Sequence, residues 1–266
     1  MKNILFLFLA LPIIGFTQIV NIPDVNFKAY LVGNEVINTN GDTEIQFTEA
    51  RVFNGHISFG DSIISNLTGL EAFTAVTGLF FVGSQLTSLD VSKNTALTAL
   101  SFSNNKITSL DVSNNTALTR LNCSDNLLTS LDVSKNTALT ELDCSRNQLT
   151  SLDVSNNTAL TALSFSNNKI TSLDVSNNNA LKYLICFGNQ LTSLDVSSNT
   201  ALTFMNCTGN QLSSLDVSKN TALEYLYCAG NQLTSLDVSK NTALTELDCS
   251  GNQFDCYVIR KKLGLK

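Results

Sequence analysis

The sequence predicts a β-rich repeat solenoid, in which short parallel strands from successive repeats stack into one long coil. Charged residues make up only 14% of the chain and tryptophan is absent, while Leu, Ser, Thr, Asn and Asp recur in fixed phrases. From Leu86 to Gln253 the text repeats every 21 residues, in eight full units. A fixed short period of this kind indicates stacked supersecondary units with little helix.

Each unit contains two copies of one pattern, and this pattern predicts two short strands per unit. In each copy, a Leu and the apolar residue two places later alternate with polar residues, so one face of the strand is buried. A single unit cannot bury that face, but units stacked at roughly 4.8 Å close a continuous core. We therefore expect two parallel β-sheets. The first unit carries the pattern at Leu86, Leu89, Val91 and Asn94, then at Leu97, Leu100, Phe102 and Asn105.

The asparagines that end the two patterns stand where the chain must turn. They form one column from Asn94 to Asn241 and a second from Asn105 to Asn252. An Asn side chain bonds to neighbouring backbone groups, so a stacked column would satisfy the turns. We interpret both columns as structural.

Six of the seven cysteines occupy one inward slot, which Phe102 and Phe165 fill in other units. A slot that accepts Phe or Cys requires apolar volume, which favours buried free thiols. Disulfides between neighbouring rungs and a metal site remain as less favoured alternatives. Cys256 lies outside this slot, in the closing cap. The six are Cys123, Cys144, Cys186, Cys207, Cys228 and Cys249.

A column of aspartates points outward from the first strand of every unit. Carboxylates one rung apart repel one another, and the nearest compensating donors are flanking Ser hydroxyls and turn amides. This favours a structural role over a ladder of divalent ions. The column comprises Asp90, Asp111, Asp132, Asp153, Asp174, Asp195, Asp216 and Asp237.

The chain outside the full units divides into shorter segments. Residues 1–17 have a basic start and an apolar run too short to span a bilayer, which predicts a cleaved signal peptide. We expect an N-terminal cap over residues 18–63, with a short helix at 25–32. The repeat region is 64–253 and begins with one degenerate unit at 64–84. Residues 254–266 form a C-terminal cap or tail.

The N-terminal cap contains a loop with the spacing of an EF-hand. Residues 38–49 place oxygen-bearing side chains at alternate positions and a Glu at position twelve, where a bidentate carboxylate closes a calcium cage. Thr43 stands at position six, where the sharp turn requires Gly. A weak calcium site is one interpretation, and a polar loop that caps the following segment is the other. The candidate ligands are Asn38, Asn40, Asp42, Glu44 and Glu49.

Solvent-facing positions on the second strand vary between units, and variation on a constant scaffold is where specificity can reside. Three adjacent units gather aromatic residues at these positions, bordered one unit later by Glu246 and Asp248. A contiguous apolar patch on a Ser/Thr/Asn surface predicts a recognition site. Cross-strand packing and contact with another copy are the alternatives. The candidate ligand-binding residues are Tyr183, Ile185, Phe187, Phe204, Tyr225 and Tyr227.

The phrase LTSLDVSKNTALTELDCSRNQ resembles the bacterial leucine-rich repeats of the 21-residue IRREKO subtype. The resemblance covers residues 86–253. It implies a secreted or surface-attached recognition protein, adhesin-like in character, with no catalytic residues to carry over. Many similar proteins end in a sorting or anchoring domain, whereas here only residues 254–266 follow the last repeat.

The predicted function is therefore binding of a protein or glycan partner at a cell surface. A net charge of −6 argues against nucleic acid, and no second apolar stretch of membrane-spanning length follows the leader. A self-associating envelope or matrix protein is the alternative. A polysaccharide hydrolase using Glu141 and Asp143 is the weakest hypothesis, because the single histidine, His56, lies beside no nucleophile motif.

Overall fold

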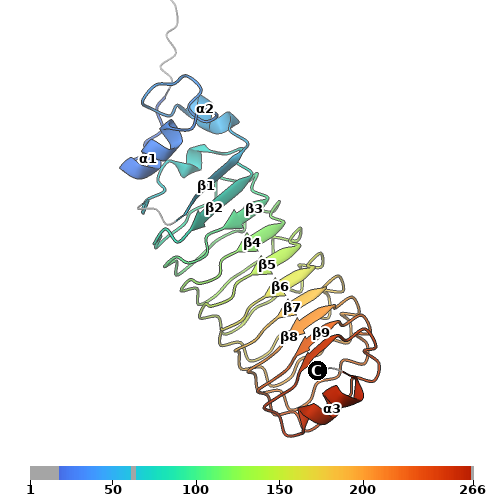
Figure 1. Ribbon diagram of the computed structural model, residues 1–266. Coiled ribbons are helices and arrows are strands. Elements are labelled where there is room, and N and C mark those ends of the chain that lie inside the picture. Colours follow the sequence, from blue (N-terminus) through green and yellow to red (C-terminus); the bar gives the residue numbers. More distant parts are fainter. Residues whose placement is uncertain (1–17, 61–63, 265–266) are drawn as a thin grey trace, which may run out of the picture.

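The computed structural model describes residues 18–60 and 64–264, so the predicted signal peptide lies outside the described residues. The chain forms an elongated coil in which the strands line up along one side (Figure 1). The helices α1 (Val25–Val32) and α2 (Phe47–Val52) lie at one end, and α3 (Cys256–Lys262) lies at the other. The predicted solenoid is confirmed.

Ten strands form one parallel sheet whose spatial order follows the sequence order. Each core position pairs with its equivalent in the next repeat, as Leu100 does with Leu121 and Leu121 with Leu142. The strands are β1 (His56–Gly60), β2 (Gly78–Val82), β3 (Ala99–Ser101), β4 (Arg120–Asn122), β5 (Glu141–Asp143), β6 (Ala162–Ser164), β7 (Tyr183–Ile185), β8 (Phe204–Asn206), β9 (Tyr225–Tyr227) and β10 (Glu246–Asp248).

The expectation of a second sheet is wrong: the described residues form one sheet, and the first pattern of each unit makes no strand. Side chains form hydrogen bonds with backbone groups that would otherwise pair strands. The amide of Ser113 donates to the side chain of Asp111, two residues earlier, at 2.9 Å. The carbonyl of Val91 accepts from the Asn115 side chain at 3.0 Å. Side chains therefore supplement the single backbone bond that links each of these segments to the next rung, such as that from Lys106 to Leu86, and strand pairing is absent there.

The core consists of inward columns of Leu, Val, Phe and Cys that run the length of the coil. Both asparagine columns link rungs and are buried except at Asn252, which confirms their structural role. Asn168, for example, donates to the carbonyls of Cys144 and Phe165 and accepts from the amide of Leu149. Backbone groups in the turns thus keep partners although water cannot reach them.

The N-terminal end contains the predicted helix at 25–32, which is α1. Asp24 caps it by accepting from the amides of Asn26 and Phe27, and its other oxygen accepts from the amide of Ser65. This carboxylate therefore joins the helix to the first repeat. The sequence did not predict that β1, within residues 18–63, would extend the sheet itself.

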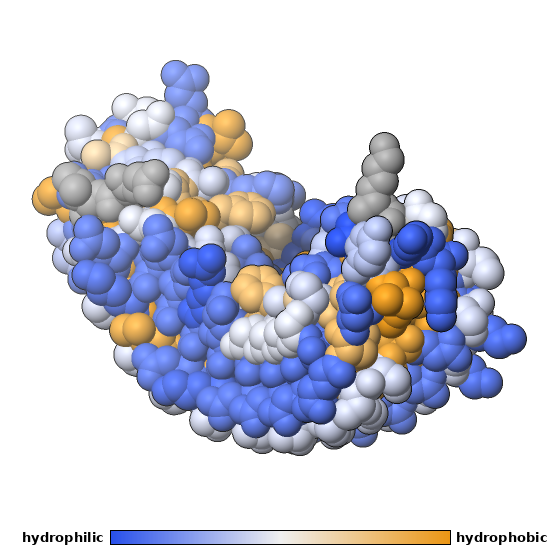
Figure 2. Space-filling model, turned by 60° about the horizontal axis from the view of Figure 1, so that its bottom comes forward, coloured by the Kyte–Doolittle hydropathy of each residue, from blue (hydrophilic) through white to orange (hydrophobic). Residues whose placement is uncertain are grey.

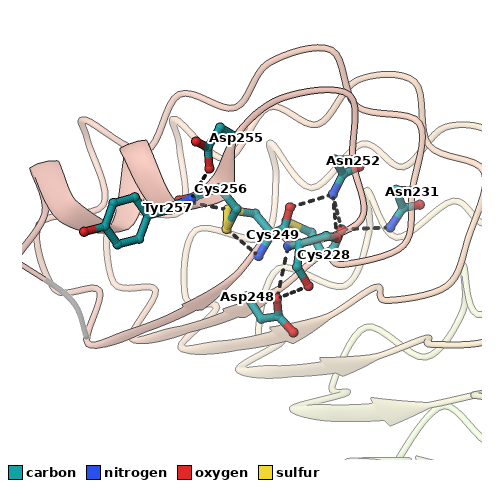
Figure 3. Close-up of a disulfide and its surroundings, with 9 residues drawn as sticks. Cys228, Asn231, Asp248, Cys249, Asn252, Asp255, Cys256 and Tyr257 are labelled. Atoms are coloured by element: carbon teal, nitrogen blue, oxygen red, sulfur yellow. Dashed lines mark hydrogen bonds between the residues drawn. A yellow bond between two sulfur atoms is a disulfide. The ribbon is translucent and has the colours of Figure 1, made fainter.

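The C-terminal end is closed by α3 and by a disulfide between Cys249 and Cys256, whose Cα atoms lie 5.3 Å apart (Figure 3). The assignment of Cys249 to the free thiols is wrong. Cys256 lies in the first turn of α3. This helix folds back over the last rung, so the sulfur of Cys256 lies next to that of Cys249. The remaining five cysteines of the column are buried free thiols, as predicted.

Candidate functional site

The exposed face of the sheet places the predicted aromatic residues on adjacent strands. Tyr183, Phe204 and Tyr225 are paired in register across β7, β8 and β9, and Tyr227 lies two residues beyond Tyr225 on the same face. We call the set of six candidates the aromatic surface. It consists of Tyr183, Ile185, Phe187, Phe204, Tyr225 and Tyr227.

Phe204 lies at the centre of a ring cluster within the aromatic surface. Its ring centroid is 6.4 Å from that of Tyr183, 5.9 Å from that of Tyr225 and 5.6 Å from that of Tyr227. These spacings are typical of attractive aromatic pairs. Ile185 lies beside Asn206 in register, and Phe187 follows β7 by two residues. No ring contact joins Phe187 to the cluster within the described part of the chain.

The aromatic surface combines ring packing with exposure to solvent. Tyr183 is 49% exposed and Tyr225 is 37% exposed, whereas Phe204 and Tyr227 are half-buried. The view in Figure 2 shows a mainly hydrophilic surface with hydrophobic side chains gathered in limited patches. Neighbour packing therefore explains only part of the aromatic side-chain area, and the remainder is available for contact with a partner.

Carboxylates border the aromatic surface on its C-terminal side. Glu246 is the register partner of Tyr225, and Asp248 is the register partner of Tyr227. A hydrogen bond to the Glu246 carboxylate is the main cause that raises the pKa of Tyr227 above its usual range. The ring cluster and the acidic edge thus lie on adjacent strands of the sheet.

A shallow groove of about 430 Å³ adjoins the aromatic surface on its N-terminal side. Phe80 and Tyr183 stand at its ends, and the small side chains of Ala99 and Ala162 leave the space between them. Sequence analysis missed this groove, although the signal was present as Ala and Ser at the outward positions of β3 and β6. To predict a groove, the side-chain sizes at equivalent positions of several strands must be compared.

Arg120 and Glu141 lie in this groove as an ion pair, with Nε and Oε1 3.3 Å apart. Asp143, the second carboxylate of the hydrolase hypothesis, accepts from the amide of Ser145 at 3.0 Å. His56 contacts the ring of Phe80 at 5.6 Å between centroids. These partners are those of ordinary surface side chains, and none positions a nucleophile.

The EF-hand-like loop converges on Glu49. Its Oε1 accepts from the amides of Thr39 and Asn40, and its Oε2 accepts from the amide of Gln46, which completes a capping box at α2. These bonds are those of a loop that caps the following helix. They occupy the carboxylate that would bind calcium in a bidentate manner.

The other candidate ligands also have protein partners. Asn38 is buried and donates to the carbonyls of Val32 and Asp42, while its side-chain oxygen has no partner. Asn40 donates to Asp42 at 3.0 Å, and Glu44 pairs with Lys28 at 2.6 Å. In the part of the chain described here, no three His, Cys, Asp or Glu side chains form a group that could hold a metal ion. Calcium binding stays one of two untested interpretations of this loop.

The aspartate column makes the compensating contacts expected of it. Each Oδ1 accepts from the amide of the Ser two residues later, as Asp195 does from Ser197 at 2.9 Å. The Ser197 hydroxyl and amide lower the pKa of Asp195, and Ser113 acts in the same way on Asp111. The structural role is confirmed, whereas a ladder of divalent ions stays untested.

The free thiols are not poised to react. Burial raises the pKa of Cys186 to about 12 and that of Cys228 to about 12. A thiol with so high a pKa is not a nucleophile at neutral pH. Across residues 18–60 and 64–264, every helix is too short or too polar to cross a bilayer.

Residues 22–157, just over half of the chain, match the family described as the LRR domain of the endo-beta-N-acetylglucosaminidase EndoS. Residues 221–257 match a family of leucine-rich repeats in two copies. No curated protein was found to match the sequence.

Solved structures share the fold. The functional domain of InlJ from Listeria monocytogenes, described as including a cysteine ladder, is 39% identical with a TM-score of 0.74. The match covers 88% of this chain and 57% of that one, so this chain spans little more than half of the InlJ domain.

Two more distant structures show the fold alone. A leucine-rich-repeat protein of Leptospira interrogans is 21% identical over 77% of this chain and 62% of its own, with a TM-score of 0.62. The receptor kinase ectodomain GASSHO1/SCHENGEN3 of Arabidopsis thaliana is 24% identical over 74% and 26%, with a TM-score of 0.65. Repeat, sheet and family matches agree: the chain belongs to the leucine-rich-repeat family.

Proposed function

We propose that this protein is a secreted or surface-attached binding module that recognises a macromolecular partner through the aromatic surface. One observation carries the proposal: a cluster of aromatic rings in mutual contact is left exposed on a sheet whose other outward positions are mainly small or polar. Tyrosine is favoured at binding interfaces because it offers a large apolar area together with a polar hydroxyl.

The fold supports this proposal. Leucine-rich-repeat solenoids offer a long regular face for contact, and the Arabidopsis ectodomain of this fold was solved in complex with CASPARIAN STRIP INTEGRITY FACTOR 2. We also propose that the protein is adhesin-like, as the repeat resemblance implies. Its partner would be a protein or a glycan, and residues 1–17 would be cleaved as a leader.

The test replaces three tyrosines of the aromatic surface together, Tyr183→Ala, Tyr225→Ala and Tyr227→Ala, and compares binding to cell-surface extracts and to glycan arrays. We expect the variant to lose the partners of the parent. Tyr257→Ala is the control, because this tyrosine is 67% exposed on α3 and lies outside the aromatic surface. If the triple variant binds the same partners with equal affinity, the site is wrongly placed.

Self-association through the same face is the second outcome to be measured. Light scattering of the parent over a range of concentrations determines its mass. If the parent forms oligomers and the triple tyrosine variant is a monomer, the aromatic surface joins copies of this chain. A monomeric parent at all concentrations leaves the surface open to a different partner.

A further inference from the structure

We propose that the partner presents a lysine- or arginine-rich protein segment, with one cationic head group seated between the rings of β8 and β9 and the carboxylates of β10. This inference rests on the proposed function and names the chemistry of its partner. It is carried by the charge and geometry of the C-terminal edge of the aromatic surface.

The outward side chains of β8, β9 and β10 include acidic residues but neither Lys nor Arg. Glu246 and Asp248 project from β10, and Glu224 is exposed directly before β9. None of the three ion pairs formed within residues 18–60 and 64–264 involves these carboxylates. The edge therefore presents carboxylates that form no ion pair with the described residues, beside exposed rings.

An earlier repeat shows how the same carboxylates are compensated elsewhere. The sequence Glu-Leu-Asp forms both β5 and β10. In β5, the register neighbour of Glu141 is Arg120, whose Nε lies 3.3 Å from the carboxylate. In β10, the register neighbour of Glu246 is Tyr225. The position that Arg120 occupies beside β5 is thus occupied by the exposed ring of Tyr225 beside β10.

A partner cation would complete this arrangement. Ring faces attract ammonium and guanidinium groups, and more strongly when water is excluded. The aliphatic stem of a Lys or Arg can lie on Phe204 and Tyr225 while its head group reaches the acidic edge. Glu246 lies in register beside Tyr225 and Asp248 lies in register beside Tyr227, which places the carboxylates next to the rings. Neutral sugars could use the rings but gain no charge interaction from the carboxylates.

The test applies the whole protein to immobilised short peptides rich in Lys and Arg, to peptides rich in Glu and Asp, to neutral Gln peptides, and to neutral glycans. We expect binding to the basic peptides, weakened by added salt. The variant Glu246→Gln with Asp248→Asn should weaken that binding about tenfold. The matched control is Glu141→Gln with Asp143→Asn, which makes the same change in β5 and should bind as the parent does.

The outcomes separate this inference from the proposed function. Binding to neutral peptides or glycans that the triple tyrosine variant loses and the β10 variant retains overturns the basic segment but keeps the aromatic surface. Binding that the triple tyrosine variant retains contradicts both, whereas no binding to any of these probes overturns the basic segment alone. Urea unfolding of each variant checks that it is folded, so a loss of binding can be attributed to the surface.

Discussion

Each asparagine of the second column replaces backbone contacts that the turn cannot make. The side chain of Asn168 donates to three carbonyls at 3.0, 2.9 and 3.3 Å and accepts from an amide at 2.9 Å, and the residue is only 7% exposed. Buried polar groups left without partners cost far more than a hydrogen bond contributes when both partners are present. The column therefore stabilises the coil through hydrogen bonds.

We predict that Asn168→Ala lowers the free energy of unfolding by about 2–4 kcal/mol, because the buried amide of Leu149 loses its partner and the carbonyls of Cys144 and Phe165 each lose one of their donors. Urea unfolding followed by circular dichroism measures the change. Lys169→Ala, at the exposed neighbouring position, should leave stability within about 0.5 kcal/mol of the parent. A loss below about 1 kcal/mol for the Asn variant would show that water replaces the side chain in the turn.

The aspartate column predicts a pH dependence with a definite sign. Hydrogen bonds from Ser197 lower the pKa of Asp195 in the folded state. A lowered pKa means that this stabilisation is present above the unfolded pKa, about 4, and is lost as pH falls through the folded value. We expect Asp195→Asn to flatten the dependence of unfolding free energy on pH in acid. Urea unfolding from neutral to acidic pH gives both curves, and parallel curves would exclude the contribution.

At the scale of elements, the C-terminal cap depends on one covalent link. The disulfide joins the last rung to α3 across seven residues, and no residue of α3 is fully buried. A short closed loop of this size stabilises by roughly 2–3 kcal/mol. We predict that Cys256→Ser loosens α3 and increases hydrogen exchange in β10. A reducing agent should have the same effect on the parent and none on the variant. Equal hydrogen exchange in β10 of the oxidised parent and the variant would contradict a stabilising role of the disulfide.

The loop at residues 38–49 has two interpretations, a calcium site and a helix cap, which the effect of calcium on stability distinguishes. Since backbone amides already occupy both oxygens of Glu49, we expect calcium to leave the melting temperature of the parent unchanged. Thermal unfolding with calcium and with a chelator measures this. A rise with calcium that Asp42→Asn abolishes would instead establish a metal site.

The elements differ in how far the sequence predicts them. Leu100 and its equivalents repeat with a period that fixes both face and register, so the stacked sheet could be predicted. The missing second sheet could not, because the Leu and Val pattern around Asp111 is that of a strand. What decides there is whether Asp111 and Asn115 bond the backbone, which depends on the conformation of the turn.

The candidate site was predictable to a similar degree. The alternation of β7 to β9 places Tyr183, Phe204 and Tyr225 on one face, and register brings them into contact. The central position of Phe204 depends on rotamers, which the sequence does not specify. The pairing of Cys249 was missed because it depends on how α3 folds back over the last rung.

At the scale of the whole molecule, each rung contacts chiefly its two neighbours. Consecutive strands pair along the full sheet, and the asparagine bonds likewise reach one rung away. The stability of such a coil is approximately a sum over repeats and the interfaces between them. Removing one complete unit should therefore shorten the coil without altering its cross-section.

We predict that deletion of residues 128–148 gives a folded protein that is slightly less stable and keeps the aromatic surface. The deletion joins Leu127 to Leu149, which takes the place of Leu128, so β4 would pair with β6 in the original register. Deletion of 128–147 removes one residue fewer and turns each later side chain in the joined rung to the opposite face. Circular dichroism, urea unfolding and small-angle scattering compare the two. A one-dimensional coil tolerates the loss of a whole rung but not a shift of the side chains between the inner and outer faces. The variant with the longer deletion should therefore be the more stable of the two. The reverse order would show that contacts beyond neighbouring rungs hold the molecule together.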